Sequence, residues 1–336
     1  MDTRTQPTVA VLLATHNGAK FIEPQMRSLK SNATAITLHW LDDHSTDNTR
    51  EAVRALAPVI GLDLREWHQP QHLGLRCVFF QLLECVDADI YLFCDQDDIW
   101  QAGKIDATVA NLLPDIASPA LCYSDALFFS SNEPNVFRRS SKVLGVDAAV
   151  CCEESRLFTS TLAWGHTIGL TRPLRDIFLK HKDIARTQAF LHDWWMYLIA
   201  VASGAARMLI DAPTTLYRRH EANSSSDLIS ARGIGALWKR QQLLRRGLAQ
   251  QARGFLLAAA TLPPGQKLER IRELAQLVTT LDRRQSPIAL LRLARRRAMP
   301  AYKHHTFWLV VTCLLSDAEA PERHPVDRKS ASGVTL

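Results

Sequence analysis

The sequence predicts an α/β fold built on a doubly wound parallel sheet, and three observations support this prediction. Short apolar runs without polar alternation, typical of buried parallel strands, alternate with segments of helical spacing. Each apolar run ends in a cluster of polar residues, as strands do at the ligand-binding edge of an open sheet. The 336 residues are 47% hydrophobic and 22% charged, a composition typical of a globular protein with a large core.

Four predicted strands and three predicted helices alternate over the first hundred residues. The expected strands are Thr8–Ala14, Ile36–Leu41, Leu62–Trp67 and Ile90–Cys94, and the expected helices are Phe21–Leu29, Asn48–Ala57 and Cys77–Cys85. Pro58 is expected to end the second helix. The α/β character continues to about Tyr217, and beyond a predicted linker at Ser224–Ser226 the chain becomes helical and basic. The polar segment Asp317–Leu336 is expected to be disordered.

Three acidic residues, Asp95, Asp97 and Asp98, follow the fourth predicted strand. Carboxylates this close together repel one another unless a positive group lies between them. A hard divalent cation, Mg²⁺ or Mn²⁺, held by one or two carboxylates and by substrate phosphates would offset their charge. The alternative is an acidic surface turn, but the apolar strand before the cluster and Ile99-Trp100 after it argue against a freely solvated turn.

Polar residues also follow the first two strands. Thr15 and Asn17 end the first strand, while Asp42 and Asp43 end the second. Neither a dinucleotide-binding G-x-G-x-x-G motif nor a P-loop follows Ala14. An acid at the second strand end can accept a hydrogen bond from a base N–H or a ribose hydroxyl. The three strand ends therefore predict one site for base, ribose and diphosphate, which is a sugar-nucleotide site.

Several motifs together resemble family 2 glycosyltransferases of the GT-A fold, and their form resembles the rhamnosyltransferase-like branch. They are Val11–Gly18, Leu41–Thr49, Cys94–Trp100, His192–Trp195 and Tyr217–His220. The resemblance implies a doubly wound mixed sheet in a GT-A catalytic domain over residues 8–225. Its nucleotide-sugar-binding half would be 8–100 and its acceptor half 101–225. A helical, basic extension over 226–316 and a disordered tail over 317–336 would follow.

The resemblance implies roles for the residues on the donor side. Asp95 and Asp97 would bracket the metal and the ribose, with Asp97 the direct metal ligand. Asp98 would be either a second ligand or a cap of the following turn. Gly74 lies in a segment that resembles a further donor-side motif. His220 would reach the diphosphate, a role that the neighbouring Arg218 or Arg219 can also fill.

On the acceptor side, Asp193 matches the base of inverting members of this family. The alternative is that Asp193 only caps the apolar helix that follows it. Trp194 and Trp195 would stack on a sugar face. Asp125, at the end of another predicted strand, would either face the acceptor or close a turn.

Four histidines replace residues that are usual in the family motifs, and these departures bear on the donor sugar more than on the reaction class. They are His16, His44, His72 and His166. A zinc site is not expected, because the sequence has no HExxH motif and no Cys/His ladder.

We therefore expect an inverting glycosyltransferase that acts in bacterial surface polysaccharide synthesis. The donor would be deoxythymidine-diphosphate L-rhamnose or a uridine-diphosphate hexose, and the acceptor a saccharide or a lipid-linked saccharide. One alternative is a metal-dependent nucleotidyl- or phosphotransferase, which would require a Gly-rich, Lys-bearing loop that Thr15–Lys20 does not provide. The other alternative is an inert scaffold of the same fold, although Asp97 and Asp193 are both retained.

The C-terminal part is strongly basic, with 16 Lys and Arg but only 3 acidic residues from Arg232 to Lys303. Basic residues that lead into the apolar stretch Phe307–Leu315 favour an interfacial helix on anionic lipid over residues 283–315. The alternative is a basic helix packed on the catalytic domain. No nucleic-acid partner is expected, because no recognition motif is present. The 7 cysteines include no CxxC pair, so we expect a reduced protein in the cytoplasm, either free or peripheral on the plasma membrane.

Overall fold

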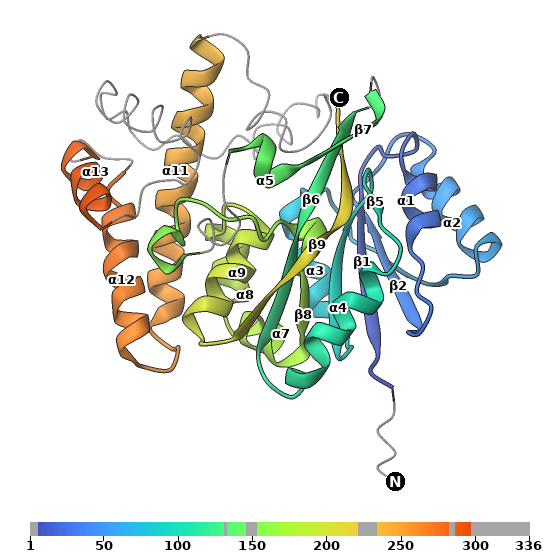
Figure 1. The fold of residues 1–336 in the computed structure, drawn as a ribbon, viewed down its shortest axis with the longest axis horizontal. Coiled ribbons are helices and arrows are strands. Elements are labelled where there is room, and N and C mark those ends of the chain that lie inside the picture. Colours follow the sequence, from blue (N-terminus) through green and yellow to red (C-terminus); the bar gives the residue numbers. More distant parts are fainter. Residues whose placement is uncertain (1–5, 131–132, 146–152, 221–233, 282–285, 297–336) are drawn as a thin grey trace, which may run out of the picture.

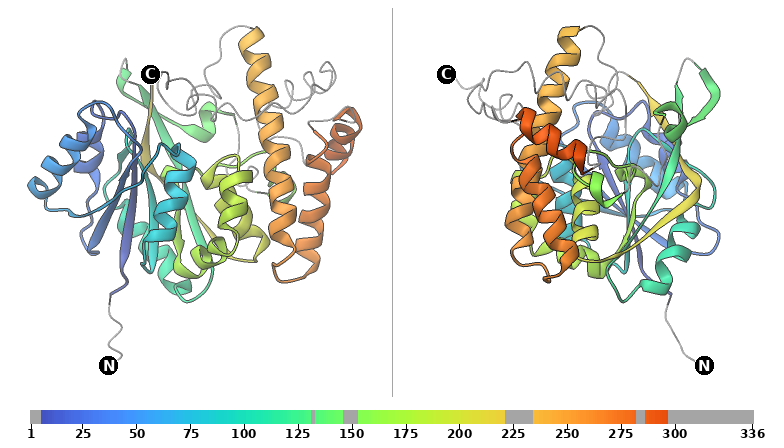
Figure 2. Two further views of the ribbon diagram at one scale, coloured as in Figure 1. Left: turned by 180° about the vertical axis from the view of Figure 1, so that it is seen from behind. Right: turned by 60° about the vertical axis from the view of Figure 1, so that its left-hand side comes forward.

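The computed structural model describes residues 6–130, 133–145, 153–220, 234–281 and 286–296. Figure 1 shows a twisted central sheet with helices on both faces and a further group of helices to one side. The reverse view in Figure 2 shows the same lateral order of sheet, inner helices and outer helices.

The strands form one mixed sheet in the order β3-β2-β1-β4-β8-β6-β9-β5, with β7 paired to β6. Strands β1 to β4 pair in parallel, whereas β8 runs antiparallel to both of its neighbours, β4 and β6. The expectation of an all-parallel sheet is thus correct only for the first half, and the mixed sheet implied by the family resemblance is confirmed. The strand bounds are β1 Val9–Thr15, β2 Ile36–Asp42, β3 Asp63–Trp67, β4 Ile90–Asp95, β5 Ile99–Trp100, β6 Ala120–Ser130, β7 Glu133–Arg139, β8 Gly169–Thr171 and β9 Ala206–Arg219.

The helices expected from the sequence are present, with small differences at their ends. Pro58 lies inside the last turn of the second helix, where its missing N–H removes a single hydrogen bond. The third helix begins two residues earlier than expected, after Gly74. The helix bounds are α1 Ile22–Ser28, α2 Thr49–Val59, α3 Leu75–Cys85, α4 Lys104–Leu112, η1 Leu113–Asp115, α5 Ser140–Val143, η2 Glu154–Arg156, η3 Gly165–Thr167, α7 Arg172–Leu179, α8 Lys182–Gln188, α9 His192–Ala202, α11 Ile234–Ala259, α12 Gln266–Val278 and α13 Ser286–Arg295.

The sheet has a hydrophobic core on each face, because successive side chains of a strand point to opposite sides. Within β1, Ala10 and Leu12 belong to one core and Val11 and Leu13 to the other. The second core is closed by α1, α2 and α4, and the first by α3, α7 and α9. A strand that is buried on both faces explains why the sequence of β1 shows no polar alternation.

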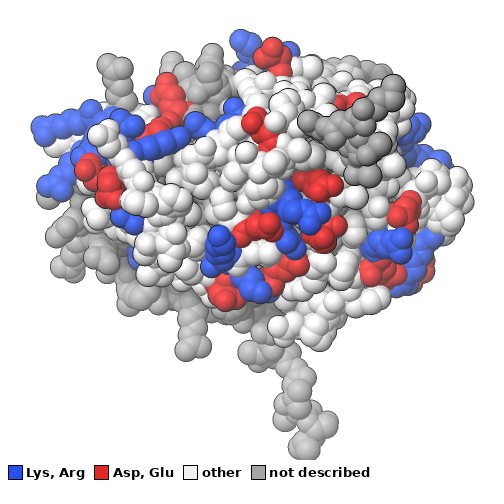
Figure 3. All heavy atoms as spheres, turned by 90° about the horizontal axis from the view of Figure 1, so that it is seen from below, with Lys and Arg blue, Asp and Glu red and all other residues white. Residues whose placement is uncertain are grey.

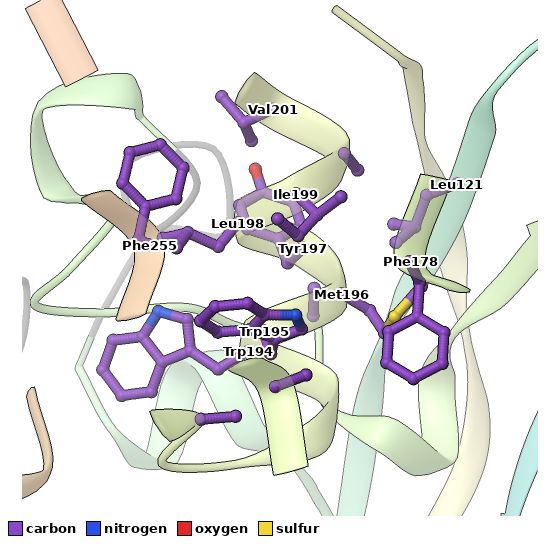
Figure 4. Packing of buried hydrophobic residues seen from close by; sticks show 14 of the residues in the cluster. Leu121, Phe178, Trp194, Trp195, Met196, Tyr197, Leu198, Ile199, Val201 and Phe255 are labelled. Atoms are coloured by element: carbon purple, nitrogen blue, oxygen red, sulfur yellow. The ribbon is translucent and has the colours of Figure 1, made fainter. Parts of the chain in front are cut away.

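The C-terminal helices share the first of these cores. All residues of α9 are buried, and Leu248 and Phe255 of α11 belong to the same cluster as Trp195 and Leu198. Figure 4 shows the side chains of α9 reaching toward Phe178 on one side and toward Phe255 on the other. The helical extension is therefore packed on α8 and α9, although its boundary at residue 226 stays a prediction.

Three expectations for the C-terminal part lie outside the described residues. These are the linker Ser224–Ser226, the apolar stretch Phe307–Leu315 and the tail Asp317–Leu336. Within the described ranges, no helix combines the length and apolar character needed to cross a bilayer. Figure 3, seen along the sheet from the N-terminal ends of β1 and β2, shows Lys and Arg interspersed with Asp and Glu on that face.

Candidate active site

The strand ends expected to form one site do meet at one edge of the sheet. Thr15 of β1 lies opposite Asp42 of β2, and Ala14 lies opposite Asp95 of β4. Since the three strands are parallel neighbours, the loops that leave them share this edge. The register thus confirms that these strand ends lie side by side, while their binding roles stay predictions.

The Asp42 carboxylate accepts hydrogen bonds from residues at the end of β1 and in the loop after β2. Its Oδ1 accepts hydrogen bonds from Thr15 Oγ1 at 2.7 Å and from Ser45 Oγ at 2.5 Å. Its Oδ2 accepts a bond from the Ser45 N–H at 2.8 Å. Thr15 Oγ1 in turn accepts a bond from the indole N–H of the buried Trp40 at 2.9 Å. Both residues therefore serve the local fold, which reduces their capacity to recognise a base.

Asp43 is 2% exposed and is saturated more fully still. Its Oδ1 accepts bonds from Gln69 Nε2 at 2.5 Å and from the Leu73 N–H at 2.7 Å. Its Oδ2 accepts a bond from the Gly74 N–H at 2.7 Å and lies 3.0 Å from His72 Nδ1. Gly74 precedes α3 with a φ of 79°, which favours glycine. Asp43 thus ties the loop before α3 to the end of β2.

Asn17 closes the turn after β1 and has a positive φ of 49°. Its N–H donates to Ser45 Oγ at 2.8 Å, and its Oδ1 accepts a bond from the Thr46 N–H at 2.8 Å. At the adjacent Gly18 a Cβ would lie 2.1 Å from Gln96 Oε1 and would displace the Gln96 amide, which is hydrogen-bonded to the backbone of His16. The loops after β1, β2 and β4 are therefore locked together.

Asp95 is a partly buried residue with one buried carboxylate oxygen that has no partner among the described residues. Its Oδ1 accepts no hydrogen bond from any residue in the described part of the chain. Burial raises the pKa of Asp95 to about 8, and the carboxylates of Asp97 and Asp193 add to this rise. The Oδ1 atom is therefore available as a ligand for a cation or as an acceptor for a hydrogen-bond donor.

Asp98 is fully buried and does not cap the following turn, so that part of the expectation is corrected. Its Oδ1 accepts a bond from the Arg218 N–H of β9 at 3.1 Å, and its Oδ2 lies 3.6 Å from His166 Nδ1. Burial, Asp97 and Asp95 together raise the pKa of the Asp98 carboxyl well above its usual value. Burial also lowers the pKa of His166 well below its usual value.

Asp97 is partly exposed and is the acid that meets the end of β9. Its Oδ2 lies 2.9 Å from His220 Nε2, and its carbonyl accepts a bond from Arg218 Nε at 2.9 Å. The His220 ring stacks on Phe21 with 4.3 Å between ring centres. The structure thus brings together two residues, Asp97 and His220, that the family resemblance placed at the diphosphate.

Asp193 lies in the first turn of α9, at the same edge as the acid cluster. Its Oδ2 accepts a bond from the Gly165 N–H at 2.7 Å, and its Oδ1 accepts one from the Trp194 N–H at 2.6 Å. The carboxylate is close enough to Asp95 to raise the pKa of that residue. The N-cap residue of α9 is Leu191, so Asp193 is not the N-cap that the alternative proposed.

The structure corrects the expectations for the two tryptophans. Trp195 is fully buried, and Trp194 is 6% exposed with its indole N–H bonded to the Leu157 carbonyl at 2.8 Å. Both rings belong to the core between α9 and α11 (Figure 4), so neither is available to stack on a sugar. An apolar helix with no polar face is buried on all sides, which explains their position.

Asp125 is also placed differently from the expectation. It lies within β6, at a register shift between Ser124 and Ala126, rather than at a strand end. Its Oδ1 accepts a bond from Ser140 Oγ, and its Oδ2 accepts one from Ser141 Oγ at 2.6 Å. Asp125 thus anchors α5 to β6, which is a structural role close to the turn-closing alternative.

Lys104 is a buried residue of the site that the sequence analysis did not identify. Its Nζ lies 4.1 Å from the centre of the Trp100 ring and donates to the His166 carbonyl. Burial lowers the pKa of Lys104 to about 7, against the opposing effects of Cys94 and Asp98. The signal was present in the sequence, because Lys104 occupies the apolar face of the helix Lys104–Leu112.

The acid cluster fits a divalent cation through two ligands rather than three. Among the residues described, no three His, Cys, Asp or Glu side chains converge on one point. Mg²⁺ and Mn²⁺ sites of this kind need only one or two carboxylates, since water and phosphate oxygens complete the shell. The unpartnered Oδ1 of Asp95 and the partly exposed Asp97 provide such a pair.

Comparison with known proteins agrees with this geometry. Residues 10–152 match the family described as "Glycosyl transferase family 2". The "dTDP-rhamnosyl transferase RfbG" of Shigella flexneri is 29% identical over 244 residues, which cover 69% of this chain and 79% of that protein. "Protein RfbJ" of the same organism is 26% identical over 105 residues, covering 31% of this chain and 76% of that protein.

Solved structures share the fold. The mannosyltransferase PcManGT from Pyrobaculum calidifontis, in complex with GDP-Man and Mn²⁺, superposes with a TM-score of 0.55 at 17% identity. The match covers 93% of this chain and 85% of that chain. TarS 1-349 of S. aureus with UDP-GlcNAc superposes with a TM-score of 0.50 at 16% identity, covering 90% of both chains. These neighbours confirm the expected GT-A fold.

Proposed function

We propose that this chain, which carries a family 2 glycosyltransferase domain over residues 10–152, is an inverting glycosyltransferase that uses a nucleotide-sugar donor. One observation supports it above the others. Asp193 and the acid cluster after β4 are nearly a hundred residues apart in sequence, yet Asp193 raises the pKa of Asp95. Direct transfer between two substrates requires that the base and the diphosphate site lie near each other, as this electrostatic effect indicates.

The donor side is formed by the acid cluster and the end of β9. A divalent cation held by Asp97 and Asp95 would act as a Lewis acid on the departing diphosphate. His220 and Arg218 lie beside Asp97 and provide N–H donors for phosphate oxygens. The protein side chains thus hold and orient the leaving group.

The acceptor side is formed by the start of α9. The Gly165 and Trp194 N–H groups each bond one oxygen of Asp193, and each oxygen keeps a further lone pair for the acceptor hydroxyl. In the proposed step the acceptor oxygen bonds to the anomeric carbon from the face opposite the diphosphate. Its proton passes to the Asp193 carboxylate while the bond between the anomeric carbon and the diphosphate oxygen breaks. The anomeric configuration is inverted.

For the donor we propose deoxythymidine-diphosphate rhamnose, with a uridine-diphosphate hexose as the alternative. The support is the name of the Shigella flexneri relative at 29% identity. A saccharide or a lipid-linked saccharide of surface polysaccharide synthesis is the proposed acceptor. Location in the cytoplasm, free or at the membrane surface, remains part of the same proposal.

The test is a calorimetric titration of purified protein with a panel of sugar nucleotides in the presence of Mn²⁺ or Mg²⁺. We expect one donor to bind, and we expect binding to be lost with EDTA and in Asp97→Asn. Binding that ignores both changes would overturn the metal-dependent part of the proposal. Transfer of a phosphoryl or nucleotidyl group from the bound donor would instead support the phosphotransferase alternative, and binding without any turnover would support the inert scaffold.

A further inference from the structure

Lys104 lies where three separate segments of the site meet. It is the first residue of α4 and is 2% exposed. Its Nζ donates to the His166 carbonyl of η3 and to Thr215 Oγ1 of β9 at 2.7 Å, above the Trp100 ring of β5. The Thr215 hydroxyl donates to the same His166 carbonyl at 2.9 Å, which closes a small hydrogen-bonded ring.

The two segments that bond to Lys104 each contact one half of the site: η3 contacts Asp193, and β9 contacts the acid cluster. On the η3 side, the neighbouring Gly165 N–H donates to Asp193 Oδ2 at 2.7 Å. On the β9 side, the strand continues to Arg218, whose N–H donates to Asp98 Oδ1 at 3.1 Å. The amine of Lys104 is therefore the common anchor of the segment that orients Asp193 and the strand that meets the acid cluster.

Stability alone does not explain a lysine at this position. Burying an amine costs free energy through lost hydration, even when the group is hydrogen-bonded. An unbranched apolar side chain such as methionine would fill much of the same space without that cost. The His166 carbonyl would keep one donor, the Thr215 hydroxyl, if the amine were removed.

We propose that Lys104 is a positioning residue that fixes the Asp193 carboxylate relative to the acid cluster, so that the acceptor hydroxyl and the donor are aligned. This inference rests on the proposed function. It assigns Lys104 no contact with either substrate. A displacement of about 1 Å between reacting groups is enough to lower a rate by roughly a hundredfold, so loss of this anchor affects the transfer step.

The test compares Lys104→Met with the parent protein and with Lys182→Met. Lys182 is a matched control, because its amine pairs with Glu84 at 3.0 Å on the surface of α8. For Lys104→Met we expect kcat to fall by about tenfold to a hundredfold, while the titrated affinity for the donor with Mn²⁺ stays within about threefold. We expect Lys182→Met to change neither quantity.

A second readout does not depend on activity. If Lys104 anchors η3, the amides of residues 162–168, including the Gly165 N–H bonded to Asp193, will exchange hydrogen faster in Lys104→Met. The exchange of β1 and β2 will be unchanged, because the Lys104 amine bonds to His166 and Thr215 and to neither of these strands. Thr215→Val, which removes the other arm of the ring with little change in volume, is expected to lower kcat by roughly threefold to tenfold.

The proposal is overturned if Lys104→Met retains kcat within twofold of the parent, or if kcat and donor affinity fall together. If Lys104→Met does not fold, Thr215→Val decides by the same two criteria. A parent protein that binds donor but transfers no sugar contradicts the proposed function itself. In that case the exchange of residues 162–168 still reports whether Lys104 anchors η3.

Discussion

The carboxylates after β2 and those after β4 lie at the same edge of one sheet but are held in opposite ways. Asp43 receives two backbone N–H bonds and two side-chain contacts. Asp95 is only partly buried, yet its Oδ1 is buried without a partner among the residues described, and its pKa is raised to about 8. A saturated carboxylate stabilises the fold, whereas one without donors is held ready for a ligand. Position at the ligand-binding edge does not distinguish the two, but the number of donors does.

Asp193 provides the strongest test of the rule that carboxylates with many hydrogen-bond donors are structural. It accepts two backbone N–H bonds, as Asp43 does, and yet we assign it to chemistry. Asp193→Asn is expected to lower kcat by about 10³-fold, because loss of a general base typically costs 10²- to 10⁴-fold. Initial rates at saturating donor would measure this, with the exposed Asp183→Asn of α8 as the control. Retention of activity would place Asp193 with Asp43 as a structural residue.

Asp43→Asn tests the saturated side. An amide offers only one acceptor oxygen, so at least one of the Leu73 and Gly74 N–H donors would face an amide NH₂ group. We expect the free energy of unfolding to fall by about 1–3 kcal/mol, the usual effect of leaving a buried donor without a partner. Urea unfolding of the metal-free protein measures it. An unchanged midpoint would show that water replaces these bonds and that saturation is not a source of stability.

Asp95→Asn tests the carboxylate that has an unpartnered oxygen. Here we expect the free energy of unfolding to rise rather than fall. A neutral amide avoids the cost of burying a charge, so the metal-free variant should gain about 1 kcal/mol at pH 8.5. The same variant should lose metal-dependent donor binding. If Asp95→Asn proves less stable than the parent under these conditions, a hydrogen-bond donor already satisfies this carboxylate and it is not held ready for a ligand.

The pH dependence of the free energy of unfolding gives a further test of the state of the Asp95 carboxyl. A carboxyl whose pKa is raised in the folded state, from its ordinary 3.8 to about 8, binds more protons folded than unfolded between these values. Its contribution to the free energy of unfolding therefore falls as pH rises from about 4 to about 8, with a slope of at most ~1.4 kcal/mol per pH unit. Unfolding in EDTA across this window should show a shallower slope for Asp95→Asn than for the parent. Parallel slopes would contradict the raised pKa.

The smallest effect is expected at Thr15. Thr15→Val removes the donor to Asp42 and the acceptor of the Trp40 indole N–H, with little change in volume. We expect the free energy of unfolding to fall by about 1 kcal/mol, with donor affinity nearly unchanged. The two quantities come from urea unfolding and calorimetry. A large loss of donor affinity with intact stability would return Thr15 to the set of binding residues.

The alternation of strands and helices, the shared edge of β1, β2 and β4, and the match to the family 2 glycosyltransferase model were all predictable from the sequence. They depend on local periodicity and on residues near one another in the chain. The antiparallel insertion of β8 between β4 and β6 was not predictable, because it pairs segments far apart. The uniformly apolar sequence of α9 indicates that Trp194 and Trp195 are buried, and this signal outweighs the expectation that their rings stack on a sugar. The saturation of Asp43 depends on the path of the loop before α3, which no local pattern specifies.

The burial of α9 between the sheet and α11 has a consequence for the order in which the protein is made. The strand ends that hold the acid cluster are complete once β4 has left the ribosome, but the outer side of α9 is covered only after α11 has been synthesised. An unfinished chain that ends before β9 thus lacks both the Arg218 and His220 partners of the acid cluster and the cover of α9. The donor side and the acceptor side of the proposed site are therefore both completed late in synthesis.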